Sequence, residues 1–440
     1  MAIVFASSYG WLLDTCSFID EGFRECVGCR VATHKRYFTC RFKSHFFDIS
    51  KPHIVDKSQS YNVSSCGLSD KTSPSKSEND TTVVPKARKK RKRKYCDLNQ
   101  GELDAQAYHE RVRSLVLEGH RSLVEAGYKT GYFSDKPSVP GQPLPSLHEC
   151  RLAALCDMAK ELPPVEDDTH DITQVVDGDP LTDAQLDLFS RITENPDDYA
   201  REVTLMGEKY FLPPCSRFLL ADITRTQPLI SNGERFDLIV LDPPWENKSV
   251  KRSNRYSFLP SSQLKLLPVP MLSRPGCVVV TWVTNRLRHL RFVKEELYPH
   301  WGVKLLAEWL WVKVTKAGDF VFPLDSPHKK PYEVLLIGRY HGNEDINSPA
   351  EESEIPDQKL LISIPSILHS HKPSLAAVMK PYVSHDAKCL EMFARSLQPR
   401  WTSWGNEVIK FQHVSYFSTE NREESPSAPV LSESQKTSEQ

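Results

Sequence analysis

The sequence reads Phe236-Asp-Leu-Ile-Val-Leu-Asp242-Pro243-Pro244-Trp245 at the point that decides the fold. The first six residues are mostly apolar, which predicts a strand buried on both faces, as in a parallel sheet. Two prolines directly after Asp242 exclude a continuation as a helix or as a paired strand. Ligands of open α/β sheets bind beyond the carboxyl ends of the strands. The sequence therefore places Asp242 where a ligand would bind.

The residues after this strand match the hydrogen-bonding pattern of an amine on a flat ring. The Asp242 carboxylate and the free carbonyl of Pro243 are two acceptors, and Pro243 and Pro244 have no N–H of their own. A planar NH2 group offers two hydrogens to such a pair. Trp245 adds a ring face on which a base can stack. The alternative is a buried strand that ends in an ordinary proline turn, but this tetrapeptide at the end of such a strand favours a functional site.

Other apolar runs predict an α/β fold. A hairpin is expected over 203–212. Further strands are expected at 218–223, 277–282, 305–314, 332–338 and 389–395, and amphipathic helices at 287–297 and 369–383. Strands that alternate with helices predict a sheet in which parallel pairs dominate.

Length and composition divide the 440 residues into five segments. We expect a small segment rich in cysteine and aromatic residues at 1–50, a disordered basic linker at 51–100, a helical accessory region at 101–202, a catalytic domain at 203–417 and a disordered tail at 418–440. In the accessory region, apolar stripes predict helices around 112–124 and 152–158, and Thr182 or Asp183 is expected to cap a third helix through Leu186 and Phe189.

Charge and cysteine content narrow the class of protein. Lys and Arg number 56 against 57 Asp and Glu, so any basic surface is local. Eleven cysteines without a secretory signal predict reduced thiols in an intracellular protein, and no stretch is long enough to span a membrane. Cys26, Cys29, His34 and Cys40 approach the spacing of a zinc knuckle, but the last interval is one residue too long. Buried thiols are the preferred interpretation, and no metal site is predicted.

Asp242-Pro243-Pro244-Trp245 resembles the signature of the MT-A family of adenine-N6 methyltransferases, which use S-adenosylmethionine. The resemblance implies that these four residues form the catalytic motif and hold the exocyclic amine of adenine. It also implies a Rossmann-like, permuted class I methyltransferase sheet, in which the cofactor segment follows the motif. No glycine-rich loop precedes Asp242, as a permuted order requires.

The resemblance extends over roughly residues 203–410 and implies the cofactor-binding residues. Arg395 and Gln398 would bind the ribose, Asp222 and Ile223 the adenine, and Lys330 the methionine carboxylate. Asn406 and Glu407 would lie near the adenine and ribose. Ala394 stands where relatives often have a glycine.

The resemblance also implies a nucleic-acid substrate. A basic loop is expected to contact phosphates through Lys248, Lys251, Arg252, Arg255 and Tyr256. The branch of the family with such a loop implies methylation of internal 2′-O-methyladenosine in a small nuclear RNA of the U2 kind, with DNA adenine as a further substrate. The alternatives are a catalytically silent RNA-binding partner, in which the acid or the aromatic of the motif is replaced, and a protein-amide methyltransferase, whose motif begins with Asn. A monomer is expected.

Residues Lys86 to Lys94 include eight cations in nine positions within a polar segment. Such a run is typical of a nuclear-import signal or a phosphate-binding arm, and we expect import into the nucleus, with the cytosol or the mitochondrion as other locations.

Deletion of Lys86 to Lys94 should shift a fluorescently tagged protein out of the nucleus without lowering its melting temperature, because an import receptor needs exposed cations. Persistent nuclear signal together with weaker, less salt-dependent RNA binding would identify a phosphate-binding arm instead.

Overall fold

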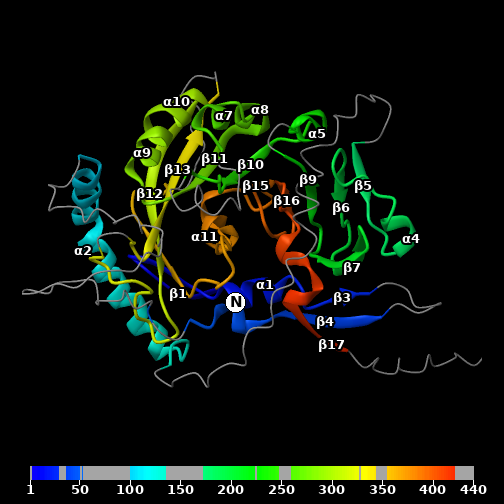
Figure 1. The fold of residues 1–440 in the computed structure, drawn as a ribbon, viewed down its shortest axis with the longest axis horizontal. Helices are drawn as coiled ribbons and strands as arrows, with labels where there is room; N and C mark the ends of the chain where they lie inside the picture. Colours follow the sequence, from blue (N-terminus) through cyan, green and yellow to red (C-terminus); the bar gives the residue numbers. More distant parts are fainter. Residues whose placement is uncertain are drawn as a thin grey trace, which may run out of the picture.

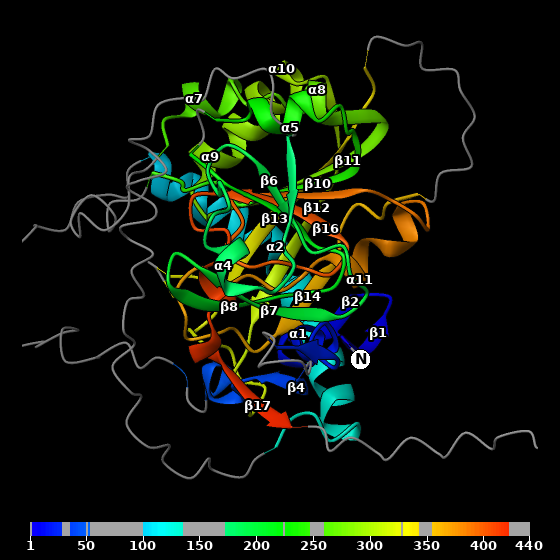
Figure 2. The same ribbon diagram turned by 90° about the vertical axis from the view of Figure 1, so that its right-hand side faces the viewer.

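The computed structural model describes residues 2–28, 36–49, 52, 100–134, 172–222, 225–246, 259–326, 329–342 and 354–421. Two sheets organise them (Figures 1 and 2). The large sheet has twelve strands in the order β1-β2-β14-β12-β13-β11-β10-β15-β16-β9-β6-β5. The small sheet has five strands in the order β17-β4-β3-β7-β8.

Five parallel strands form the centre of the large sheet. They are β11 (Ser273–Val283), β10 (Phe236–Leu241), β15 (Cys389–Met392), β16 (Trp401–Gly405) and β9 (Arg217–Leu220). In β10, Leu238 and Val240 pack in one buried cluster and Ile239 and Leu241 in another, as expected for a strand covered on both faces. Because β9 precedes β10 in sequence but lies beyond β15 and β16, the strand order is permuted, and the predicted fold class is confirmed.

The flanks of the large sheet contain antiparallel and N-terminal strands. On one side lie β13 (Tyr332–Tyr340), β12 (Val303–Lys313), β14 (Leu360–Ser363), β2 (Gly10–Leu13) and β1 (Ile3–Ser7). On the other side lie β6 (Ile192–Glu194) and β5 (Thr173–Val175). The sequence pattern did not predict β14, β5 or β6.

The small sheet joins the two ends of the chain. It consists of β17 (Phe417–Asn421), β4 (Tyr37–Phe42), β3 (Cys26–Val27), β7 (Ala200–Leu205) and β8 (Glu208–Leu212). The predicted hairpin is confirmed, with Val203 opposite Tyr210. Strand β17 extends four residues into the predicted tail. The predicted boundaries at 50, 202 and 417 therefore do not follow the sheets.

Most helices are short, and one group of them gathers at the top of Figure 2. They are α5 (Gln227–Ser231), α7 (Ser261–Lys265), α8 (Val269–Leu272), α9 (Leu287–Arg291), which continues as a π-helical turn at Phe292–Leu297, and α10 (Tyr298–His300). The others are α1 (Thr15–Glu21), α4 (Pro180–Asp183) and α11 (Ala376–Met379), with 3-10 turns at Ser44–Phe47, Lys380–Tyr382, Lys410–Gln412 and Val414–Tyr416.

The longest helix, α2 (Gln100–Lys129), confirms the first predicted stripe of the accessory region. Val112, Val116 and Leu123 are at most 4% exposed and pack in the core. The helix lies against β1, β2 and β14 at the left of Figure 1. None of the described helices, this one included, has the length and apolar character of a membrane-spanning segment.

The third predicted helix is wrong. Helix α4 is capped by Asp179, whose carboxylate accepts the Leu181 N–H at 2.9 Å, and it ends at Asp183. The Asp187 carboxylate then accepts the N–H groups of Phe189 and Ser190, each at 3.1 Å, which competes with helical hydrogen bonding. The helix expected over 369–383 is likewise reduced to α11 and one 3-10 turn. The predicted stripe at 152–158 and the linker over 53–99 lie outside the described residues.

Buried thiols do occur in the small sheet. Cys26 and Cys40 lie on the neighbouring strands β3 and β4, are at most 1% exposed, and form a side-chain hydrogen bond with each other. Cys29 and His34 lie outside the described residues. Within the described ranges, no group of three or more His, Cys, Asp or Glu side chains is placed to hold a metal ion.

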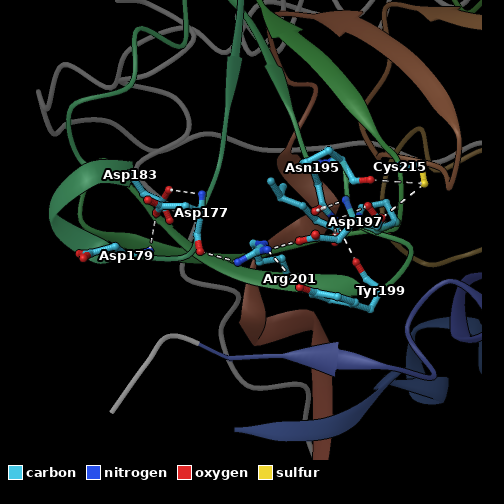
Figure 3. A network of polar contacts seen from close by, with 11 residues as sticks. Asp177, Asp179, Asp183, Asn195, Asp197, Tyr199, Arg201 and Cys215 are labelled. Carbon is cyan, nitrogen blue, oxygen red and sulfur yellow. Dashed lines mark hydrogen bonds and ion pairs between the residues drawn. The ribbon is translucent and has the colours of Figure 1, made fainter. Parts of the chain in front are cut away.

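Arg201 at the start of β7 ties two loops to the small sheet (Figure 3). Its guanidinium donates to the Asp177 carbonyl and the Asp197 carboxylate, and at 3.3 Å to the Tyr199 hydroxyl. Nearby, the buried Asn195 amide donates to the Tyr199 carbonyl at 3.0 Å. These contacts explain why residues 176–199 fold as turns and short strands around one cation.

Arg201→Ala should lower the free energy of unfolding by about 3 kcal/mol, because it leaves the Asp197 carboxylate unpaired in a partly buried position. Urea unfolding followed by circular dichroism measures the change. The matched control is Arg24→Ala, whose ion pair with Glu21 is exposed and should contribute less than about 1 kcal/mol. Equal losses in both variants would contradict this role of Arg201.

Candidate active site

Asp242 lies at the carboxyl end of β10, where the parallel strands β10 and β15 meet. Its N–H donates to the Met392 carbonyl at the end of β15, at 3.3 Å, and its side chain is mostly buried. The carboxylate contacts two cations. Lys372 Nζ lies 3.2 Å from Oδ1, and Arg395 Nη1 lies 3.1 Å from Oδ2. The crevice predicted from the sequence therefore contains a carboxylate held between two positive groups.

These ion pairs belong to a longer alternation of charge. Lys372 also pairs with Glu333 at 3.2 Å, and Glu333 pairs with Lys313. On the other side, Arg395 Nε lies 3.0 Å from Glu407, and Glu407 lies 2.7 Å from Lys410. Four cations and three carboxylates thus alternate through the crevice.

Burial and the neighbouring charges shift the pKa values of these groups in opposite directions. Burial alone would raise the pKa of Glu333, but the ammonium groups of Lys372 and Lys313 lower it to about 2. Burial would lower the pKa of Lys372, but Asp242 and Glu333 raise it. Both groups are therefore charged at neutral pH.

The backbone after β15 takes an unusual path to bring Arg395 to Asp242. Phe393 has a φ of 62°, a left-handed conformation that is rare for a bulky residue. The next residue, Ala394, donates its N–H to the Trp404 carbonyl at 3.0 Å. A Cβ atom on Gly405 would lie 2.9 Å from the Ala394 carbonyl oxygen. Gly405 on the neighbouring strand therefore allows the two backbones to approach closely at Ala394, which stands where relatives often have a glycine.

The Pro243 carbonyl is not free, in contrast to the prediction from the sequence. It accepts the Trp245 N–H at 2.9 Å, because the two prolines fold the chain back at the end of the strand. One of its two lone pairs remains available to a ligand. The Pro244 carbonyl accepts the Leu259 N–H at 3.1 Å.

Trp245 forms part of the wall of the crevice. Its indole N–H donates to the Trp282 carbonyl at 2.8 Å, and its ring lies 4.9 Å from that of His289. Only 7% of the residue is exposed. The orientation of the ring is therefore fixed, and stacking of a base on it stays a prediction.

Gln398 and Glu391 form a second polar pair beside the cations. The Gln398 amide donates to Glu391 at 2.7 Å and accepts the Ser374 hydroxyl at 2.5 Å. Burial raises the pKa of Glu391 to about 7, although the hydrogen bond from Gln398 lowers it. Sequence reasoning found Gln398 but not Glu391, although Glu391 lies in the same strand-and-loop segment.

Of the other predicted site residues, some lie at the same edge of the sheet and some lie outside the described residues. Asp222 and Asn406 follow the neighbouring strands β9 and β16, whose ends are joined by the Ala221 N–H and the Gly405 carbonyl at 3.3 Å. They therefore lie at the same edge of the sheet as Asp242. Ile223 and the basic loop residues Lys248, Lys251, Arg252, Arg255 and Tyr256 lie outside the described residues.

Lys330, the lysine predicted for the methionine carboxylate, donates to the Leu324 carbonyl at 3.2 Å. Burial lowers the pKa of Lys330, and the charges of Asp325 and Glu110 oppose that shift. Lys372 is the lysine beside Asp242 instead, and sequence reasoning missed it. His371-Lys372-Pro373 resembles His328-Lys329-Lys330-Pro331 and lies closer to β15 in the sequence, but the pattern alone does not rank Lys372 above Lys330.

Comparison with known proteins agrees with this geometry. A family profile described as MT-A70 matches residues 236–407. The N(6)-adenine-specific methyltransferase METTL4 of Homo sapiens is 49% identical over 386 residues, covering 86% of this chain and 80% of that protein. The chain belongs to the MT-A70 family.

Two further relatives of this MT-A70 chain match about half of it. The N6-methyladenosine RNA methyltransferase MTA1 of Pyricularia oryzae is 34% identical over 218 residues, covering 47% of this chain and 56% of that protein. The DNA N6-methyl methyltransferase of Caenorhabditis elegans is 32% identical over 215 residues, covering 47% and 56%.

The MT-A70 family uses S-adenosylmethionine as methyl donor, and the described residues fit that cofactor. Lys372 is a cation that matches its carboxylate, and Arg395 and Gln398 would contact the ribose, as the family resemblance implies. Glu407, Glu391 and Gln398 supply the acceptors and donors that its ammonium and ribose hydroxyl groups require.

Lys372→Ala should weaken S-adenosylmethionine binding by about 10- to 100-fold, the value of one charge-assisted hydrogen bond. Isothermal titration calorimetry on the full chain measures the dissociation constant. Lys330→Ala is the matched control and should leave it unchanged. The reverse result, with weakening only in Lys330→Ala, would return the carboxylate-binding role to Lys330.

Proposed function

We propose that this adenine-N6 methyltransferase acts on RNA, on the N6 amine of an internal 2′-O-methyladenosine in a small nuclear RNA of the U2 kind. The observation that carries the amine assignment is the Asp242 carboxylate at the carboxyl end of β10, followed by the Pro243 carbonyl and the fixed Trp245 ring. The RNA substrate is supported by the basic loop after Trp245 and by the relative named as an RNA methyltransferase.

The motif prepares the amine for attack by positioning it. One oxygen of Asp242 and the second lone pair of Pro243 accept its two hydrogens. An adenine amine is a poor nucleophile, because its lone pair is delocalised into the ring. Hydrogen bonds that favour a pyramidal nitrogen localise that lone pair, and the fixed Trp245 wall holds the ring in one plane. When bound, S-adenosylmethionine supplies an electrophilic methyl group.

Two cations position the Asp242 carboxylate in the same site. Lys372 and Arg395 hold Asp242 ionised and oriented, since each contacts a different carboxylate oxygen. Each oxygen has a further lone pair, so the amine does not need to displace the cations. Positioning of this kind accounts for most of the catalysis that the site can provide. The methylated nitrogen is acidic enough to lose its proton without a strong base.

A DNA substrate is the second candidate, because a relative is named as a DNA methyltransferase. A catalytically silent partner protein is disfavoured by the intact motif, since Asp242 and Trp245 are both present. The Asp242 carboxylate also disfavours a protein-amide substrate, for which Asn begins the motif. We further propose a nuclear location through Lys86 to Lys94 and a monomeric state.

Recombinant protein with labelled cofactor should methylate an RNA oligonucleotide containing internal 2′-O-methyladenosine faster than matched RNA or DNA with unmodified adenosine. Asp242→Asn should lower the turnover by about 10²–10³-fold, because the amide exchanges one acceptor for a donor. Nucleoside analysis of the product identifies N6,2′-O-dimethyladenosine. Preference for the DNA oligonucleotide would overturn the RNA proposal, and near-normal turnover of Asp242→Asn would overturn the amine assignment.

A further inference from the structure

The loop that carries Lys372 packs on the N-terminal part of the chain. The Ile367 N–H donates to the Phe46 carbonyl at 2.7 Å. The His371 ring lies 5.6 Å from Phe42, edge to face, and 5.7 Å from Phe47. On another side, it stacks on Phe411 at 4.4 Å, with 22° between the ring planes. We name Phe42, Phe47 and Phe411 the aromatic cage of His371.

His371 is held in this cage as a neutral ring. It is 8% exposed, and burial lowers its pKa to about 4, so it is uncharged at neutral pH. Its Nδ1 has no hydrogen-bond partner among the described residues. A catalytic or charge-pairing role would require such a partner, whereas packing of the ring does not. Packing against the three phenylalanines thus explains the position of the His371 ring.

The residue before His371 shows that the surroundings determine the loop conformation. Ser370 has a φ of 62°, in the left-handed region. A non-glycine residue keeps such a conformation only where neighbouring contacts impose it. The cage and the bond to Phe46 supply these contacts. Lys372, which points to Asp242, is the next residue after His371.

A small cavity separates the N-terminal segment from the cofactor residues. Its volume is about 40 Å³. Phe18 and Ile19 of α1 line one side, and Lys372, Glu391 and Gln398 line the other. The space is large enough for about three or four water molecules at about 10–15 Å³ each. Thr15, Phe18, Ile19, Phe23 and Phe42 therefore line a cavity next to the cofactor residues, although the MT-A70 profile begins at 236.

We propose that Phe42 and Phe47 are positioning residues of the cofactor site, which clamp His371 and thereby direct the Lys372 ammonium toward the cofactor carboxylate. The N-terminal segment is then part of the cofactor-binding unit and not a separate accessory element. This inference rests on the proposed role of Lys372.

The test compares Phe42→Leu, Phe47→Leu, His371→Ala and His371→Phe in the full chain. Calorimetry gives the dissociation constant of S-adenosylmethionine, and steady-state kinetics give kcat and KM. Phe42→Leu, Phe47→Leu and His371→Ala should each raise the dissociation constant about tenfold, as expected when a charged group is misplaced. At saturating cofactor, kcat should fall by less than the dissociation constant rises, because Arg395 still holds the other oxygen of Asp242. His371→Phe keeps an aromatic ring and should bind as the parent does.

Phe38→Leu is the matched control. Phe38 lies on β4 with Phe42 and is equally buried, but its ring contact is with Phe211. The Phe38→Leu variant should lower the melting temperature as much as Phe42→Leu does, without changing cofactor affinity. Equal affinity losses in both variants, or failure of His371→Phe to restore binding, would overturn the proposal. If Lys372→Ala binds cofactor normally, the role of Lys372 fails instead, and the cage variants should then show no specific effect.

Discussion

The ion pairs of the Asp242 carboxylate with Lys372 and Arg395 bring together three segments that are far apart in sequence. Asp242 ends β10, Arg395 follows β15, and Lys372 lies on the loop before α11. Their meeting point depends on the parallel pairing of β10 with β15, which places both strand ends at one edge of the sheet. Phe393 and Ser370 adopt left-handed conformations beside the two cations. The backbone is therefore strained at both points where it delivers a positive group to the carboxylate.

The alternation of four cations and three carboxylates is a poor way to stabilise a fold. Desolvation of buried charges offsets much of their attraction, and well-packed apolar groups often stabilise as well. The position of these charges is better explained by a ligand that carries charges of its own. S-adenosylmethionine has a carboxylate, an ammonium and a sulfonium group. A site for such a molecule needs cations and carboxylates close together, and each must stay paired when the cofactor leaves.

Residue patterns predicted the parts of the fold that depend on long apolar runs. The strands from Phe236 to Leu241 and from Cys277 to Trp282 are buried on both faces, so their composition alone identifies them. Strands β5, β6 and β14 have three or four residues, and their pairing depends on neighbours that no local pattern reveals. The helix expected after Asp183 failed for a different reason, because the Asp187 carboxylate competes for the N–H groups that a helix would use.

In the active site, too, some residues could be predicted from local sequence patterns and others could not. Asp242, Arg395 and Glu407 could be predicted because each lies at the end of a recognisable strand or within the segment that resembles the family. Lys372 and Glu391 could not be ranked from the sequence, since a lysine in a loop and an acid in a strand are common. Only the distances to Asp242 and Gln398 single them out.

The N-terminal segment shows why a boundary drawn from composition can miss a functional unit. Its cysteines and aromatic residues suggested a small independent element, yet its strands pair with both sheets. The segment also presents Phe42 and Phe47 to the loop beside Lys372. The parallel core can bring Asp242 and Arg395 together without it, because strand pairing fixes both. The loop with Lys372 has no such pairing, so its conformation must come from packing, and Phe42, Phe46 and Phe47 supply much of that packing.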